Sequence, residues 1–269
     1  MPEITLPSGV TLSYVDEGAR DARPIVLLHG VCMGKQYFRR QFEPLSASHR
    51  VIAPDFRGHG ESEKVETGHT VPQYARDLKQ FLEALEVSTP VLLGWSMGAF
   101  VAWDYIQQFG TGEIRGLIVV DEAASDFKTD DFPHGFVDFD TLREIMVHVQ
   151  EDPDEFLRGL VPAMFHTEQP EADIRWMLEV SGSLPASEMS AILFDQCVRD
   201  YAPVLESIDI PNVVFWGQHD GLLPIAGGEH VVSHTPGASL VAFENSGHCS
   251  FFEEAERFNE EVERFVASL

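Results

Sequence analysis

Apolar runs of strand length alternate along most of this chain with segments that carry the helical spacing of apolar residues. Such alternation is typical of parallel strands joined by crossover helices. The expected strands are Ile4 to Leu6, Val10 to Val15, Pro24 to Leu28, Arg50 to Ala53, Pro90 to Leu93, Ile114 to Val120, Asn212 to Trp216 and Ser239 to Phe243. The expected helices are Val71 to Leu85, Met97 to Phe109, Pro224 to Ser233 and Phe251 to Leu269. The sequence therefore predicts an α/β fold: a mostly parallel eight-stranded sheet, flanked by helices, with an antiparallel hairpin at its edge.

One stretch, from residue 124 to residue 202, interrupts the alternation, because it has several helical patterns and no convincing strand. We expect it to be an inserted helical cap, with residues 1–123 and 203–269 forming the core of a single large domain. The insertion is rich in large apolar side chains, among them Phe136 and Phe165. These side chains either line a ligand pocket or pack the cap onto the sheet.

Acidic residues dominate the charge of the chain, with 44 Asp and Glu against 18 Lys and Arg and a formal net charge of −26. Such a surface repels phosphate backbones and anionic lipids, so nucleic-acid and membrane partners are disfavoured. The acids are spread along the whole chain, a pattern that resembles proteins of salt-loving organisms. An ordinary acidic protein is the alternative, and instability below about 0.5 M salt would favour the first interpretation.

The three cysteines, Cys32, Cys197 and Cys249, are an odd number without CxxC spacing, which argues against a disulfide scaffold or a thiolate metal site. His230 and His234 lie four residues apart on an expected helix, but they lack a third ligand, so no metal site is predicted. No apolar run approaches the roughly 20 residues needed to span a bilayer. We therefore expect a cytoplasmic protein.

The motif with the clearest chemical meaning is Gly94-Trp95-Ser96-Met97-Gly98, a GxSxG sequence directly between a buried strand and a helix. A turn this tight holds its serine in a strained conformation that exposes the hydroxyl above the carboxyl end of the sheet. Glycines at both flanks let the strand and the helix approach closely. The placement therefore marks Ser96 as a nucleophile.

A serine hydroxyl needs a base, and the base needs a carboxylate to orient it. His248 follows the last expected strand, and Asp220 follows the strand before it, so both lie at the carboxyl edge of the sheet. Asp121 and Glu122 also end a strand at this edge and compete for the acid role. We expect the catalytic triad to be Ser96, His248 and Asp220.

An oxyanion that forms on the substrate needs hydrogen-bond donors. The N–H of Met97 lies at a helix N-terminus, and the N–H of Val31 lies in the loop after the Pro24 to Leu28 strand, so we expect these two groups to form the oxyanion hole. His29 is expected to hold that loop rather than to react. Trp95 either packs beside the nucleophile or contacts the substrate.

Together the His29-Gly30 loop, the segment Asp55 to Ser62, the GWSMG motif, the segment Gly217 to Pro224 and the triplet Ser246 to His248 resemble the α/β-hydrolase family. The short loop and the Ser-Met-Gly turn resemble its serine esterase and cofactor-free haloperoxidase branch. This resemblance implies that no metal or organic cofactor is needed. Val31-Cys32-Met33 departs from the aromatic residue and proline of many haloperoxidase-like members.

The predicted function is that of a carboxylesterase-like serine hydrolase that acts on a small-molecule acyl substrate as a monomer or homodimer. Trp95, Phe136 and Phe165 are its expected substrate-binding residues. Perhydrolysis, enol-lactone hydrolysis and carbon–carbon bond hydrolysis are alternatives that use the same triad. A non-catalytic small-ligand binding protein is the alternative from another class.

Overall fold

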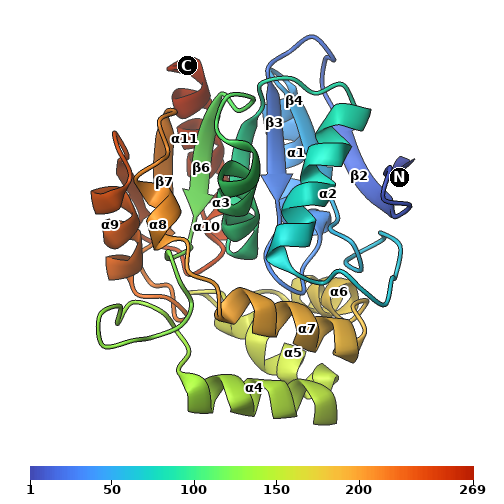
Figure 1. Ribbon diagram of the computed structural model, residues 1–269, viewed down its shortest axis with the longest axis vertical. Helices are drawn as coiled ribbons and strands as arrows, with labels where there is room; N and C mark the ends of the chain where they lie inside the picture. The colour runs from blue at the N-terminus through green and yellow to red at the C-terminus, as the bar shows by residue number, and fades with distance from the viewer.

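The computed structural model describes residues 1–269 and contains one eight-stranded sheet in the order β1-β2-β4-β3-β5-β6-β7-β8 (Figure 1). The strands are β1 (Glu3–Thr5), β2 (Thr11–Glu17), β3 (Pro24–Leu28), β4 (Arg50–Pro54), β5 (Val91–Trp95), β6 (Gly116–Val120), β7 (Asn212–Gly217) and β8 (Leu240–Phe243). β2 pairs antiparallel with both β1 and β4, and every other pair is parallel. The predicted α/β fold with a mostly parallel sheet is confirmed.

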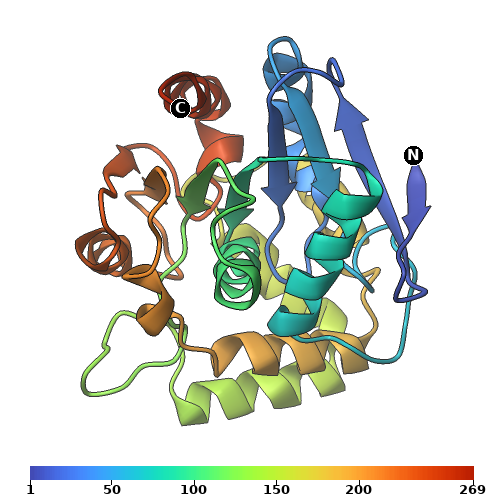
Figure 2. The same cartoon turned by 45° about the horizontal axis from the view of Figure 1, so that its top comes forward.

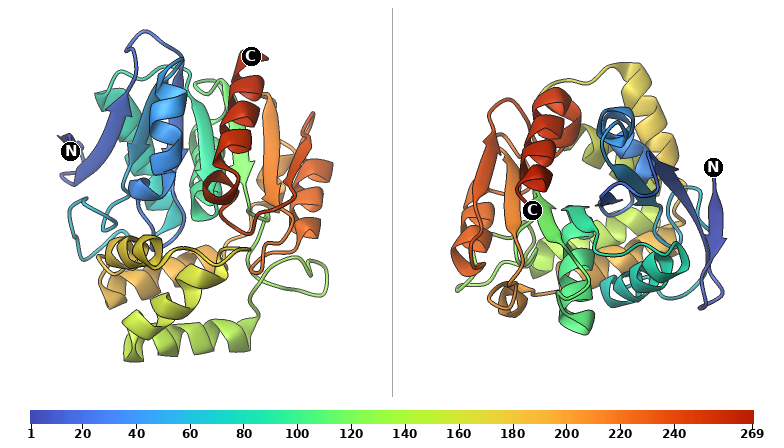
Figure 3. Two further views of the ribbon diagram at one scale, coloured as in Figure 1. Left: turned by 180° about the vertical axis from the view of Figure 1, so that it is seen from behind. Right: turned by 90° about the horizontal axis from the view of Figure 1, so that it is seen from above.

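Helices cover both faces of the sheet (Figures 1 and 3). One face carries α2 (Val71–Ala84), α3 (Met97–Phe109), α8 (Ala202–Leu205) and α9 (Ile225–His234). The opposite face carries α1 (Arg39–Ser46), α10 (Ser250–Glu253) and α11 (Ala255–Ala267), and the 3-10 turn η1 (Lys35–Phe38) leads into α1. None of these helices has the length and apolar character needed to cross a membrane, and neither has any other helix of the chain.

Two features of the second face differ from the sequence prediction. α1 was not predicted, because its sequence is polar and contains Pro44. The helix predicted over Phe251 to Leu269 is divided at Glu254, whose backbone angles, φ −114° and ψ 47°, are not helical. The carboxylate of Glu254 accepts hydrogen bonds from Asn245 and Ser246, so this residue is held against the preceding loop instead of continuing the helix.

Four further helices lie together beyond the carboxyl ends of the parallel strands (Figures 1 and 2). They are α4 (Phe139–Glu151), α5 (Pro153–Ala163), α6 (Glu171–Ser181) and α7 (Ala186–Cys197). Asp138 and Asp152 cap the first two of them, each accepting a backbone N–H three residues later. We interpret residues 124–202, which include all four helices, as an inserted cap over the strand ends.

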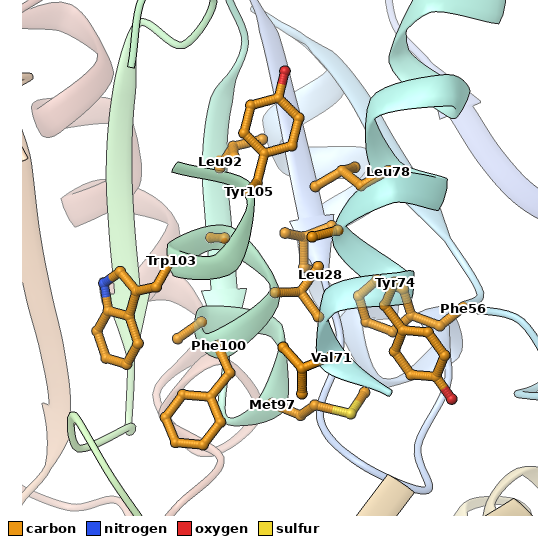
Figure 4. Packing of buried hydrophobic residues seen from close by; sticks show 14 of the residues in the cluster. Leu28, Phe56, Val71, Tyr74, Leu78, Leu92, Met97, Phe100, Trp103 and Tyr105 are labelled. Carbon is orange, nitrogen blue, oxygen red and sulfur yellow. The ribbon is translucent and has the colours of Figure 1, made fainter. Parts of the chain in front are cut away.

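The packing of α2 and α3 against the sheet forms the larger of two main hydrophobic clusters (Figure 4). Side chains from the two helices meet Leu28 of β3 and Leu92 of β5 in this cluster, and they include Val71, Tyr74, Leu78, Met97, Phe100, Trp103 and Tyr105. Every residue of α3 from Met97 to Ile106 is buried. The start of α3, where the GxSxG motif lies, is therefore held by a densely packed core.

Candidate active site

Ser96 lies in the turn between β5 and α3 with φ 52° and ψ −126°, a left-handed conformation that is strained for a residue with a side chain. The flanking glycines make the turn possible. A Cβ atom on Gly94 would lie 2.4 Å from the carbonyl oxygen of Gly98, and one on Gly98 would lie 2.1 Å from that of Leu28. The Ser96 N–H donates to Val120 at 3.0 Å, which holds the turn against β6.

His248 and Asp220 form the contact expected of a base and its orienting acid. The His248 Nδ1–H donates to Asp220 Oδ2 at 2.8 Å, and Asp220 Oδ1 accepts the N–H groups of Leu222 and Leu223 at 2.8 and 3.2 Å. Because Nδ1 carries the hydrogen, Nε2 of His248 is left as an acceptor. Ser96 and His248 line the same cavity, and no direct hydrogen bond joins their side chains.

The competing carboxylates at this edge of the sheet have other contacts. Asp121 accepts the N–H of Gly217 at 2.6 Å and the hydroxyl of Ser250 at 3.1 Å, and so it ties β6 to β7 and α10. Glu122 is fully buried and lines the cavity, but it makes no hydrogen bond to His248. Asp220 is therefore the carboxylate that contacts His248.

The environment of His248 raises its pKa above the usual value of a histidine. Burial alone lowers this pKa, because it disfavours the charged ring, but the charge and hydrogen bond of Asp220 and the charges of Asp121 and Asp126 outweigh burial. The imidazolium that forms when His248 takes a proton is thereby stabilised.

Two glutamates hold the loop that carries His248, and the sequence analysis did not identify them. Glu254 Oε2 accepts the Asn245 N–H at 2.9 Å and the Ser246 hydroxyl at 2.7 Å, while Glu253 Oε2 accepts the Gly247 N–H at 2.7 Å. No sequence signal pointed to them, since both lie within a run predicted as continuous helix. Their carboxylates make the His248 loop part of the packed structure.

Two buried histidines support the loop that carries Val31. His29 Nε2 accepts the Phe56 N–H at 3.1 Å, so its Nδ1–H donates to the Gly30 carbonyl oxygen at 2.8 Å. His59 Nε2 likewise accepts the Cys32 N–H at 3.2 Å. Burial lowers the pKa of His29 to about 3 and that of His59 well below its usual value, so both rings are neutral. His29 therefore lies where it can hold the loop.

The two expected oxyanion donors are the backbone N–H groups of Val31 and Met97. The Val31 N–H forms no hydrogen bond within the chain, and Val31 lines the same cavity as Ser96. The Met97 N–H is the first of α3, where helix geometry provides no intrahelical partner. Val31 thus lies at the cavity as expected of an oxyanion donor, whereas Met97 is not among the residues that line it.

The cavity above Ser96 has a volume of about 240 Å³ and is mostly apolar. Trp95 and Phe136, two of the expected substrate-binding residues, line it together with the apolar residues Val31, Met33, Ile145, Phe156, Leu160, Met164, Leu193, Leu222 and Leu223. Its polar side chains are Ser96, His248, Glu122, Asp126 and Gln196. This size and lining fit a small organic molecule.

Phe165 does not line the cavity, contrary to the sequence prediction. α5 ends at Ala163, and a turn closed by a hydrogen bond from Phe165 N–H to Pro162 follows it. This turn places the Phe165 ring edge-on to Phe252, with ring centroids 5.7 Å apart. The side chain therefore packs the cap segment against α10.

No group of three or more His, Cys, Asp or Glu side chains is arranged to hold a metal ion. The three cysteines are all buried and unbridged. The backbone N–H of Cys32 donates to His59. Burial raises the pKa of the Cys249 thiol. These thiols are inert compared with an exposed cysteine.

The sequence and the fold were compared with those of known proteins. Residues 23–255 match the family model described as alpha/beta hydrolase fold. The chain is 29% identical to the AB hydrolase superfamily protein YisY of Bacillus subtilis over 96% of each chain, and 28% identical to the non-heme chloroperoxidase CPO-A1 of Kitasatospora aureofaciens over 99% of each. It is also similar to the solved structure of an esterase from Exiguobacterium antarcticum, with a TM-score of 0.93, 26% identity and 98% of each chain covered.

Proposed function

The chain belongs to the alpha/beta hydrolase fold family, and we propose that it is a serine hydrolase that cleaves the carboxylic ester of a small, largely apolar substrate. One observation carries this proposal. Ser96, in its strained turn, and His248, which is hydrogen-bonded to Asp220, line the same mostly apolar cavity. An ester carbonyl bound there faces a nucleophile, a base and two free N–H groups at once.

In the proposed reaction, Ser96 Oγ attacks the ester carbonyl carbon while His248 Nε2 accepts the hydroxyl proton. Asp220 stays ionised and stabilises the imidazolium through its bond to Nδ1. The tetrahedral intermediate collapses when the bond to the alcohol oxygen breaks and His248 returns the proton to that oxygen. The alcohol leaves, and the acyl group remains on Ser96.

Water completes the proposed cycle. His248 takes a proton from a water molecule, the water oxygen attacks the acyl carbon, and Ser96 leaves with the proton that His248 returns. The N–H groups of Val31 and Met97 stabilise the oxyanion in both halves of the reaction, and each such donor contributes about 3 to 4 kcal/mol.

The relatives support two outcomes for the same acyl-enzyme. The similarity to an esterase, which covers 98% of each chain, favours attack of water on the acyl-enzyme. The likeness to a non-heme chloroperoxidase favours a second candidate function, in which hydrogen peroxide replaces water and a peracid is formed. Both reactions use Ser96, His248 and Asp220 in the same roles, so the first test must address the nucleophile.

The direct test is covalent labelling of the protein by a fluorophosphonate probe, read by intact mass at high and low KCl, with Ser96→Ala as the control. Labelling of the wild type alone is expected. Absence of labelling in the folded wild type at both salt concentrations would overturn the proposed mechanism and favour a ligand-binding protein. Hydrolysis of p-nitrophenyl esters and peracid formation with added peroxide then distinguish the two candidate activities.

A further inference from the structure

One end of the cavity is polar, although the proposed mechanism does not use the side chains found there. Glu122 and Asp126 are fully buried and Gln196 is 2% exposed, yet all three line the cavity that contains Ser96 and His248. No lysine or arginine lines this cavity. Buried carboxyl groups without a cation nearby are costly, so their presence in an otherwise apolar pocket calls for a partner.

The hydrogen bonds within this polar end leave acceptors unpaired. Gln196 Nε2 donates to Asp126 Oδ2 at 2.6 Å, and the Ala123 N–H donates to Glu122 Oε1 at 2.8 Å. Three buried oxygen atoms receive no hydrogen bond from an N–H or hydroxyl group of the chain: Glu122 Oε2, Asp126 Oδ1 and Gln196 Oε1. The carboxyl groups of Glu122 and Asp126 lie within hydrogen-bond reach of each other and can share a proton, whereas Gln196 Oε1 has no such neighbour. Buried polar atoms in folded proteins nearly always have a partner, so this excess of acceptors indicates that a donor enters from outside the chain.

Protonation does not remove the excess of acceptors. Burial raises the pKa of Asp126 to about 6, and burial, followed by the nearby Asp126 charge, raises the pKa of Glu122 well above its usual range. Both shifts favour a proton held by the pair of carboxyl groups. One proton held between the two carboxyl groups pairs an oxygen of Glu122 with an oxygen of Asp126, but Gln196 Oε1 still lacks a donor and the pair still carries a negative charge.

The polar end is built by two separate parts of the chain and lies close to the nucleophile. Glu122 follows Val120, the last residue of β6, whose carbonyl oxygen accepts the Ser96 N–H. The Asp126 carbonyl oxygen accepts the N–H groups of Phe136 and Val137, both at 3.0 Å, which anchors this loop. Gln196 comes from α7 of the cap segment. A substrate that reaches Ser96 therefore has these oxygens within the same enclosure.

We propose that the polar end of the cavity binds a hydrogen-bond-donating group of the substrate, a hydroxyl or a protonated amine, so that the natural substrates are hydroxy- or amino-substituted esters rather than plain alkyl esters. This inference rests on the proposed ester hydrolysis and adds the substrate class to it. The apolar walls hold the hydrocarbon part, while Glu122, Asp126 and Gln196 select the donor.

The test measures kcat/KM on two matched ester series, one varied in the acyl chain and one in the alcohol, with chains of about three to six carbons that end in methyl, hydroxyl or ammonium. In at least one series and at one chain length, the donor-ended ester is expected to exceed its methyl-ended match by about tenfold or more. Equal or better turnover of the methyl-ended esters throughout both series would overturn the inference. The choice between hydroxyl and ammonium then identifies the natural donor.

A variant tests whether the oxygens of Glu122, Asp126 and Gln196 cause the preference for donor-ended esters. Glu122→Gln introduces an amide N–H₂ that can satisfy Asp126 from within the chain, so this variant is expected to bring the donor-to-methyl ratio to about one. Glu260→Gln, the same chemical change at an exposed carboxylate on α11, is the matched control and keeps the wild-type ratio. An unchanged ratio in Glu122→Gln would overturn the assignment.

A binding arm separates this inference from the proposed reaction. Calorimetric titration of Ser96→Ala with the same esters measures affinity without turnover. If the wild type hydrolyses no ester, the proposed function fails, while tighter binding of donor-ended esters by about tenfold still supports the polar end as a ligand site. If esters are hydrolysed but neither kcat/KM nor affinity favours the donor, the further inference alone fails.

Discussion

The indole N–H of Trp95 donates a hydrogen bond of 2.8 Å to the backbone carbonyl oxygen of His248. The residue that precedes Ser96 is thereby tied to the residue proposed as its base. The indole is fully buried against Tyr37, Phe38 and Phe251. Trp95 therefore lines the cavity and also connects β5 to the loop that carries His248.

Replacement of this indole is the first prediction. Trp95→Phe keeps an aromatic ring but removes the donor and leaves the His248 carbonyl unpaired, which we expect to destabilise the fold by about 2 kcal/mol. We also expect kcat/KM to fall about tenfold, because the position of His248 is less restrained. Urea denaturation and ester hydrolysis check the two effects. Wild-type activity in a destabilised variant would mean that Trp95 has only a packing role.

The pH dependence of activity follows from the environment of His248. Only the neutral ring can accept the Ser96 proton, so kcat/KM rises with pH as His248 loses its proton. Because the pKa of His248 is raised, the midpoint of this rise is expected above the ordinary histidine value of about 6.5. A midpoint below that value would contradict the assignment of His248 as a base held by Asp220.

Asp220→Asn tests the same pair from the other side. The amide cannot stabilise the imidazolium, so we expect kcat to fall by about 10⁴-fold while the fold is retained. Loss of the carboxylate also removes a charge that raises the pKa of His248, and the residual activity should therefore show its midpoint at lower pH. Asp121→Asn is the comparison: the Asp121 charge also raises the pKa of His248, but its carboxylate bonds to Gly217 and Ser250 and not to the ring, so a much smaller loss is expected. An equal loss of activity in both variants would show that Asp220 is not the specific acid partner of His248.

The His248 loop should depend on Glu254. Glu254→Ala removes the acceptor for Asn245 and Ser246, so we expect kcat to fall about tenfold and the free energy of unfolding to fall by about 1 to 3 kcal/mol. The exposed neighbour Glu256→Ala should change neither quantity. Steady-state kinetics and chemical denaturation provide the comparison. Matching behaviour of the two variants would show that the loop holds its position without this carboxylate.

The acidic surface predicts a dependence of stability on salt. The chain has 44 acidic and 18 basic residues. In dilute buffer, repulsion among the carboxylates destabilises the folded state, and concentrated salt screens this repulsion. We expect the free energy of unfolding to rise by more than about 1 kcal/mol between about 0.05 M and about 2 M KCl. Urea titrations at the two concentrations measure it. A constant value would identify an ordinary acidic protein without adaptation to salt.

Much of the fold could be predicted because its signals are local. Buried strands such as Val91–Trp95 are continuous apolar runs, and the period of apolar residues identifies long helices such as α2. The polar α1 escaped prediction, since its sequence has few apolar residues and contains Pro44; in the structure it packs against α11. The break at Glu254 also escaped, because its cause is a pair of hydrogen bonds to a loop nine and eight residues away.

The sequence by itself determined the fold class and the turn at Ser96, because strand periodicity and the two glycines that the turn requires are properties of short segments. Only the tertiary structure decided which strand-end carboxylate meets His248, which aromatic rings face the cavity and where Glu122, Asp126 and Gln196 leave oxygens unpaired. Asp220 and His248 are 28 residues apart, and Asp126 and Gln196 are 70 apart. Contacts over such separations are set by the packing of the sheet and the helices above it, and no local pattern records them.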